Sequence, residues 1–146
     1  MELVIKRFED LTLEELYGII HCREEVFVVE QNIIYQDLDY LDQNSTHVFV
    51  KVNGTVVSYL RIIDPGIKFK ETSIGRVLTM KGFRHKGLSR DLMEVAIKEV
   101  RARNQMPVKI EAQEYLVKFY ESLGFESKSE PFILEGIPHV TMLLKE

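Results

Sequence analysis

The chain has 146 residues, of which 45% are hydrophobic and 29% are charged, so it can bury a core beneath a solvated surface. That balance excludes a disordered chain, and the formal net charge of −4 gives the surface no general attraction for nucleic acid or an anionic membrane. The one cysteine, Cys22, excludes an intramolecular disulfide and a cysteine-rich zinc module. Charges interrupt the first apolar run, and no later run is long enough to span a membrane. We therefore expect a single cytoplasmic domain over residues 1–146.

The first third of the chain carries signals for a strand and a helix. Residues 3–8 alternate enough to form a strand, and Thr12-Leu-Glu-Glu15 has the pattern of a capping box at the start of a helix. Val26 and Phe27 continue the apolar character into a second short helix. Residues 36–46 are acidic and poor in structure signals, so we expect a loop there.

The middle of the chain predicts three strands and a helix. Residues 47–51 and 55–63 are rich in β-forming residues, and Asn53-Gly54 between them is a strong hairpin signal. Residues 73–80 form the third strand. Residues 88–103 have a wide apolar face, which indicates a helix packed on a sheet.

The last third predicts shorter elements. These are a strand over 108–112, a helix over 115–123 that stops at Gly124, and closing strands from Phe125 and over 140–144 around a turn at 135–138. We see no linker or internal repeat. This order of elements predicts a mixed α/β (α+β) fold.

The segment Arg84-His85-Lys86-Gly87-Leu88-Ser89 lies between a predicted strand and a predicted helix. Free N–H groups at a helix N-terminus favour phosphate oxygens, and small residues let a diphosphate approach the backbone. The segment matches neither a Walker A loop nor a dinucleotide fingerprint. The alternative interpretation is an ordinary basic loop in which the glycine makes a turn.

A second segment of interest follows the strand that ends at Gln113. In Phe119-Tyr-Glu-Ser-Leu-Gly-Phe125, the helical spacing places Tyr120 on an apolar face. From spacing alone, Tyr120 is a core tyrosine whose hydroxyl reaches the surface.

Together the two segments resemble the acetyl-CoA-binding core of the GNAT superfamily of N-acetyltransferases. The first is similar to its pyrophosphate loop, and the second is similar to the segment beside the cofactor thiol. Further segments resemble the ElaA-like subfamily, namely Arg23-Glu-Glu-Val-Phe-Val-Val-Glu-Gln31, Tyr35-Gln-Asp37, Ala112-Gln113 and Gly136-Ile-Pro-His139.

The resemblance implies a single-domain GNAT-like fold with a mixed central sheet of about six to seven strands and a splayed strand pair at the acetyl-CoA site. Tyr120 would protonate the leaving thiolate. Backbone groups of one splayed strand would bind the pantetheine arm, the loop would hold the pyrophosphate, and Gln113 would lie near the pantetheine. The implied acetyl-CoA-binding residues are Val77, Leu78, Thr79, Arg84, His85, Lys86, Gly87, Leu88, Ser89 and Gln113.

Two positions depart from the family pattern. Ser89 stands where Gly or Ala is usual, and the strand over 73–80 lacks the carboxylate that serves some members as general base. Glu30 and Asp37 are the candidates for the base, although a surface glutamate at a helix end also explains Glu30.

The acidic loop and the histidines admit other interpretations. Asp37, Asp39 and Asp42 lack the glycine and distal glutamate of a calcium loop, so they are either solvated surface or the mouth of a site for a cationic amine. His21, Cys22 and His139 do not have the spacing of metal ligands, and we expect no metal. His139 is a candidate for the substrate cleft.

The sequence therefore predicts an acetyl-CoA-dependent N-acetyltransferase that acts by direct attack of an amine. No histidine motif accompanies Cys22, which disfavours it as an acyl carrier. A non-catalytic acyl-CoA sensor with the same fold is the alternative. The acceptor is a small-molecule or peptide amine whose identity the sequence leaves open. The sequence also does not decide whether the chain forms a homodimer or whether it uses acyl groups other than acetyl.

Overall fold

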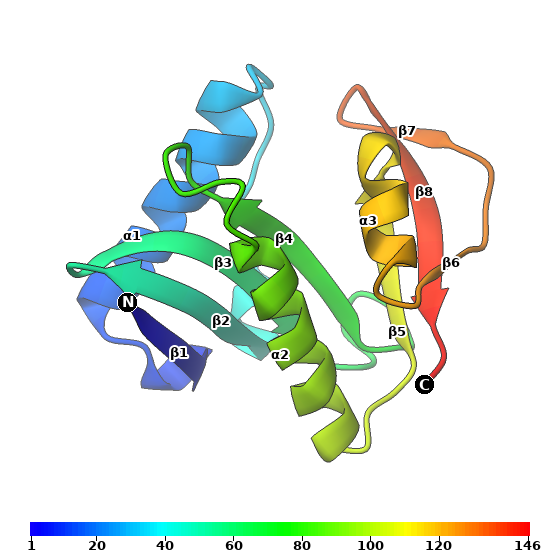
Figure 1. Ribbon diagram of the computed structural model, residues 1–146, viewed down its shortest axis with the longest axis horizontal. Helices are drawn as coiled ribbons and strands as arrows, with labels where there is room; N and C mark the ends of the chain where they lie inside the picture. Colours follow the sequence, from blue (N-terminus) through cyan, green and yellow to red (C-terminus); the bar gives the residue numbers. More distant parts are fainter.

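The computed structural model describes residues 1–146 and contains two four-stranded sheets (Figure 1). The first has the antiparallel order β1-β2-β3-β4, with β1 (Glu2–Arg7), β2 (Ser45–Val52), β3 (Thr55–Ile63) and β4 (Ser73–Thr79). In the second, β8 (Ile137–Leu144) pairs antiparallel with β5 (Val108–Gln113), β6 (Glu126–Ser127) and β7 (Phe132–Leu134). The predicted mixed α/β class is confirmed. The implied single central sheet of about six to seven strands is instead eight strands divided between two sheets.

The two sheets meet at the start of β4 and β5. Thr72 and Val108 form a parallel bridge, and the Lys109 N–H donates to the Thr72 carbonyl at 2.9 Å. Beyond this point the two strands separate toward their C-terminal ends (Figure 1). The predicted splayed strand pair is thereby confirmed.

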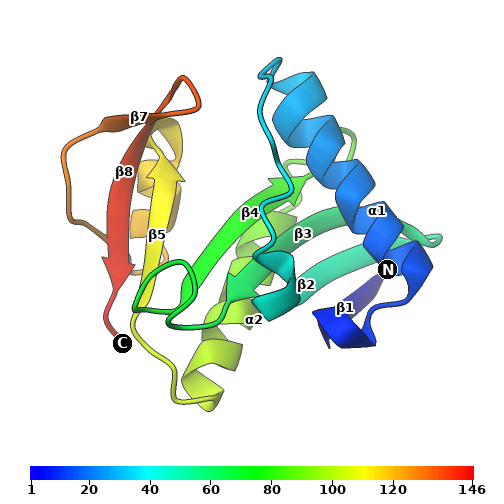
Figure 2. The ribbon, with the colours of Figure 1, turned by 180° about the vertical axis from the view of Figure 1, so that it is seen from behind.

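Three helices cover the sheets. Helix α1 (Leu13–Arg23) lies on one face of the first sheet, and α2 (Leu88–Ala102) lies on the other (Figures 1 and 2). The short α3 (Val117–Glu121) covers the second sheet on the same side as α2. The capping box is present, since Glu15 N–H donates to the Thr12 hydroxyl and Thr12 N–H donates to the Glu15 carboxylate, each at 3.0 Å. No helix is both long and apolar enough to cross a membrane.

The helices divide the core into two clusters. The larger one lies between α2, the first sheet and the second sheet, and it includes Leu92, Met93 and Met142. The smaller one lies beneath α1 and includes Ile19, Phe49 and Tyr59. Because both clusters extend to β4, that strand is held from both faces before it reaches the gap between the sheets.

Four local predictions need correction. α1 continues through wide π-helical turns over Glu24–Glu30, in place of a separate second helix. The predicted loop over 36–46 ends in a 3-10 turn at Asp42–Asn44, and Ser45 already pairs with Ile63. The predicted helix over 115–123 begins with the 3-10 turn Glu114–Leu116, because the chain must first turn out of β5. The turn over 135–138 is only Glu135-Gly136, both with positive φ, so Ile137 and Pro138 belong to β8.

Candidate active site

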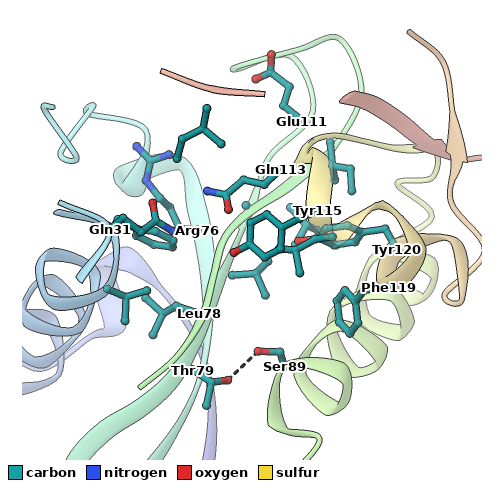
Figure 3. Close-up of a pocket in the computed structure, with 18 of the residues that line it drawn as sticks. Gln31, Arg76, Leu78, Thr79, Ser89, Glu111, Gln113, Tyr115, Phe119 and Tyr120 are labelled. Atoms are coloured by element: carbon teal, nitrogen blue, oxygen red, sulfur yellow. Dashed lines mark hydrogen bonds between the residues drawn. The ribbon is translucent and has the colours of Figure 1, made fainter. Parts of the chain in front are cut away.

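A cavity of about 830 Å³ lies where β4 and β5 separate. Its walls come from β4, the start of α2, β5, the segment through α3, and β8, and the end of the α1 extension covers one side. In Figure 3, Thr79 and Ser89 lie at one end of the cavity and Glu111 and Gln113 at the other, while Tyr115, Phe119 and Tyr120 lie together on one side. Segments that are distant in sequence thus share one cavity.

Strand β4 carries a bulge at the cavity wall. Leu78 pairs with Tyr59 and Gly75 pairs with Arg61, so Arg76 and Val77 both face the single residue Leu60. Arg76 has φ +53°, a left-handed conformation that costs a non-glycine residue about 1–3 kcal/mol. A bulge leaves backbone groups without a partner in the ladder, here at the edge of the cavity.

Ion pairs hold Arg76 in this conformation. Its Nη2 donates to the Asp37 carbonyl at 2.9 Å, and its Nε lies 2.7 Å from the Asp37 carboxylate at an angle too poor for a hydrogen bond. Tyr35 lies under the guanidinium, with its ring centre 5.8 Å from Cζ. The loop before β2 therefore fixes the bulge of β4.

The first turn of α2 has free amide groups. Gly87 caps the helix with φ +79° and offers no side-chain cap, and no backbone acceptor bonds the N–H groups of Leu88, Ser89 and Arg90. An added Cβ on Gly87 would meet nothing within 4 Å. Free amides, the helix dipole and open space together form a site suited to an anion.

The unusual Ser89 joins this turn to β4. Ser58 donates to the Leu78 carbonyl at 3.0 Å, so Thr79 must donate to Ser58 and Ser89 must donate to Thr79. Ser89 Oγ lies 2.7 Å from Thr79 Oγ1 (Figure 3). The serine hydroxyl therefore serves to tie the start of α2 to the end of β4.

Arg84 is already engaged by the chain. Its Nε donates to the Thr79 carbonyl at 2.8 Å, and its Nη1 and Nη2 both donate to Glu30, the latter at 2.7 Å. The hydrogen bonds from Arg84 lower the pKa of Glu30, so this carboxylate is a weaker base than a free glutamate. The two side chains connect the α1 extension to the loop before α2.

Tyr120 is 6% exposed and lines the cavity. Phe119 and Phe125 hold its ring edge to face, with centroids 5.1 and 5.8 Å away. Its hydroxyl makes no hydrogen bond within the chain, and burial raises its pKa. A buried neutral phenol that faces a cavity can donate a proton there.

The three aspartates of the acidic loop, Asp37, Asp39 and Asp42, do not form an acidic surface on the cavity wall. Asp37 and Asp42 bond to the buried Arg23 at 2.9 and 2.7 Å. Arg61, also buried, bonds to Asp42 and Asp39 at 2.8 and 2.6 Å. Arginines pair with all three aspartates, of which Asp37 and Asp42 are buried and none lines the cavity. The loop is therefore neither of the two predicted alternatives, a solvated surface or the mouth of a site for a cationic amine.

Sequence reasoning did not single out several residues of the cavity wall. Arg76, Tyr115 and the Lys68–Glu111 pair, at 2.9 Å, all line the cavity. The one sequence signal for these residues is Arg76, a charged residue in an otherwise uncharged strand. His139 does line the cavity, and it lies opposite Gln113 in the β5–β8 ladder.

Comparison with known proteins identifies the family. The family model described as "Acetyltransferase (GNAT) domain" matches residues 9–146. The chain belongs to the GNAT acetyltransferase family. It is therefore an acyltransferase, as the resemblance implied.

Several GNAT relatives match over nearly the whole chain. A UPF0039 protein of Synechocystis is 37% identical over 142 residues, covering 96% of this chain and 92% of the relative. The crystal structure of an acyl-CoA N-acyltransferase from Pseudomonas aeruginosa has a TM-score of 0.92 and 36% identity, with 97% of each chain covered. That of Escherichia coli ElaA has a TM-score of 0.91 and 31% identity, with 99% of each chain covered. The predicted ElaA-like resemblance is confirmed.

Proposed function

We propose that this chain transfers the acetyl group of acetyl-CoA to a primary amine by direct attack. The observation that carries the proposal is the single cavity that joins the uncapped start of α2, the bulge of β4 and the Tyr120 hydroxyl. These are respectively an anion site, a set of unpaired backbone groups and a proton donor. Acetyl-CoA needs all three, because it carries a diphosphate, an amide-rich arm and a thioester.

The residues present fit acetyl-CoA. The amides of Leu88, Ser89 and Arg90 would hold the diphosphate, and the open space over Gly87 lets it approach. Lys86, in the same loop, adds positive charge near it, and the His85 ring, which lines the cavity, can donate a hydrogen bond. Backbone groups of Val77, Leu78 and Thr79 would bind the pantetheine arm, with Gln113 across the cavity.

Acetyl-CoA supplies an activated acyl group. The amine nitrogen would form a bond to the thioester carbonyl carbon, and the carbon–sulfur bond would break. Unpaired N–H groups at the bulge would stabilise the negative charge that develops on the carbonyl oxygen. Tyr120 would give its proton to the departing sulfur, and the amine would lose one proton to a base.

The chain's own carboxylates are poorly suited to that last step. Glu30 is bonded to Arg84, Asp37 is bonded to Arg23 and Tyr35, and β4 has no carboxylate. This observation also favours a second candidate function, a non-catalytic acyl-CoA sensor. The two candidates differ in turnover and agree in binding.

Calorimetry with acetyl-CoA, followed by thiol release over a panel of amines, separates the two functions. The panel contains amino acids, amino-acid amides, polyamines and peptides with free N-termini. We expect binding and amine-dependent thiol release. Tight binding without release on any amine would favour the sensor, and absence of binding would contradict both.

A further inference from the structure

The proposed reaction needs a group that accepts the proton of the amine, and the candidates are the titratable side chains around the cavity. The carboxylates with a close partner are Glu30, held by Arg84, and Glu111, held by Lys68 at 2.9 Å. Glu135 is exposed on the turn between β7 and β8. Tyr120 is reserved for the leaving sulfur. His139 remains.

His139 has a fixed tautomer when it is neutral. Its Nδ1 lies 2.7 Å from the Ile137 carbonyl, which can only accept, so Nδ1 carries the proton. Nε2 then has a free lone pair, and no group of the chain bonds to it. An imidazole held through one nitrogen with the other free is the arrangement of a general base.

The register of the second sheet places His139 on the wall of the cavity. It pairs with Gln113 across the β5–β8 ladder, and side chains opposite each other lie on the same face. Both residues line the cavity, and Figure 3 shows Gln113 extending into it. On the other side, β7 supplies Phe132, whose ring centre lies 6.4 Å from that of His139. The half-buried ring is therefore placed beside the cavity and is accessible from it.

We propose that Nε2 of His139 is the general base that takes the proton from the acceptor amine, directly or through one water. This inference rests on the proposed acetyl transfer. The proton moves from the amine nitrogen to Nε2, and the resulting imidazolium keeps its Nδ1 bond to Ile137. The other titratable and charged groups that line the same cavity are Glu30, Tyr35, Lys68, Arg76, Arg84, His85, Arg90, Glu111, Tyr115, Tyr120 and Glu135.

The test compares His139→Asn with the wild type. An asparagine amide can replace the Nδ1 donor to Ile137 but offers no basic nitrogen. We expect kcat/KM for the amine to fall by roughly 10²–10⁴, with melting temperature and acetyl-CoA affinity unchanged. The wild-type profile of kcat/KM against pH should have an acid limb that the variant lacks. Added imidazole should restore part of the rate in His139→Ala, which has room for it.

His21→Asn is the matched control, because His21 is an exposed residue of α1 outside the cavity. It should keep the wild-type rate and pH profile. His139→Gln serves as a second variant if the asparagine form is unstable. A rate within threefold of wild type and an unchanged acid limb in a folded variant would overturn the role of His139 while acetyl transfer stands. Absence of turnover in the wild type would instead overturn the proposed function and this inference with it.

Discussion

Tyr120→Phe tests the one side chain that is proposed to donate a proton to the leaving thiolate. The substitution keeps the ring and its packing against Phe119 and Phe125 and removes only the hydroxyl. Because that hydroxyl has no hydrogen-bond partner in the chain, its loss removes no internal bond, and the melting temperature should stay nearly unchanged. If the hydroxyl protonates the thiolate, kcat should fall by roughly 10²–10⁴, the usual range for general acid catalysis.

The assay follows thiol release at saturating amine and acetyl-CoA, with acetyl-CoA affinity measured separately. Tyr115→Phe is the matched control, since Tyr115 lines the same cavity but is 73% exposed. Burial raises the pKa of Tyr120, so its proton should be retained above the ordinary tyrosine value of about 10. The wild-type kcat should therefore show no alkaline decline below that pH. A Tyr120→Phe enzyme within a few-fold of wild type would refute the assignment.

Further predictions concern the cofactor loop and the ion pairs. Arg84→Ala should weaken acetyl-CoA binding by about 1.5–3 kcal/mol. Glu30→Gln removes a carboxylate that competes with the diphosphate for Arg84, so it should strengthen binding by at most about 1 kcal/mol. Calorimetry that finds acetyl-CoA affinity unchanged in both variants would contradict the assignment of this loop to the diphosphate. Asp42→Asn leaves the buried Arg23 and Arg61 short of a partner and should lower the free energy of unfolding by about 3–5 kcal/mol in urea titrations; a loss below 1 kcal/mol would show that the network is dispensable. Burial raises the pKa of Glu15, but hydrogen bonds from the Thr12 N–H, Lys6 and Lys51 outweigh it and lower the pKa to about 2. The ionised Glu15 should therefore stabilise the fold at neutral pH, and this stability should be lost as pH falls from about 4.5 toward 2. Acid unfolding of Glu15→Gln should lack this part of the transition.

Local rules account for the parts of the fold that were predicted well. The capping box at Thr12 and Glu15 needs only residues three apart, and it is present. Asn53 and Gly54 both have positive φ, as the two-residue hairpin turn requires. Gly124, with φ +102°, follows the last turn after α3. Each feature depends on its immediate neighbours in sequence.

The site depends on pairs that no local rule can reveal. Glu30 and Arg84 are 54 residues apart in sequence, and Arg61 meets Asp39 across 22. From the sequence alone the aspartates therefore indicate a solvated surface or the mouth of a site for a cationic amine, although the fold places an arginine against each one. Likewise, Arg76 lies in a strand-forming run and would not be expected at φ +53°, a conformation that the surrounding ion pairs hold.

The central claim is direct transfer of acetyl from acetyl-CoA to an amine. Mass spectrometry of a reaction with isotopically labelled acetyl-CoA tests it most directly, with the free thiol, the product and the intact protein quantified together. The account predicts one labelled N-acetyl product for each thiol released and no labelled acetyl group on the protein, Cys22 included. Labelled protein that passes its acetyl group to the amine, or thiol release without an N-acetyl product, would contradict it.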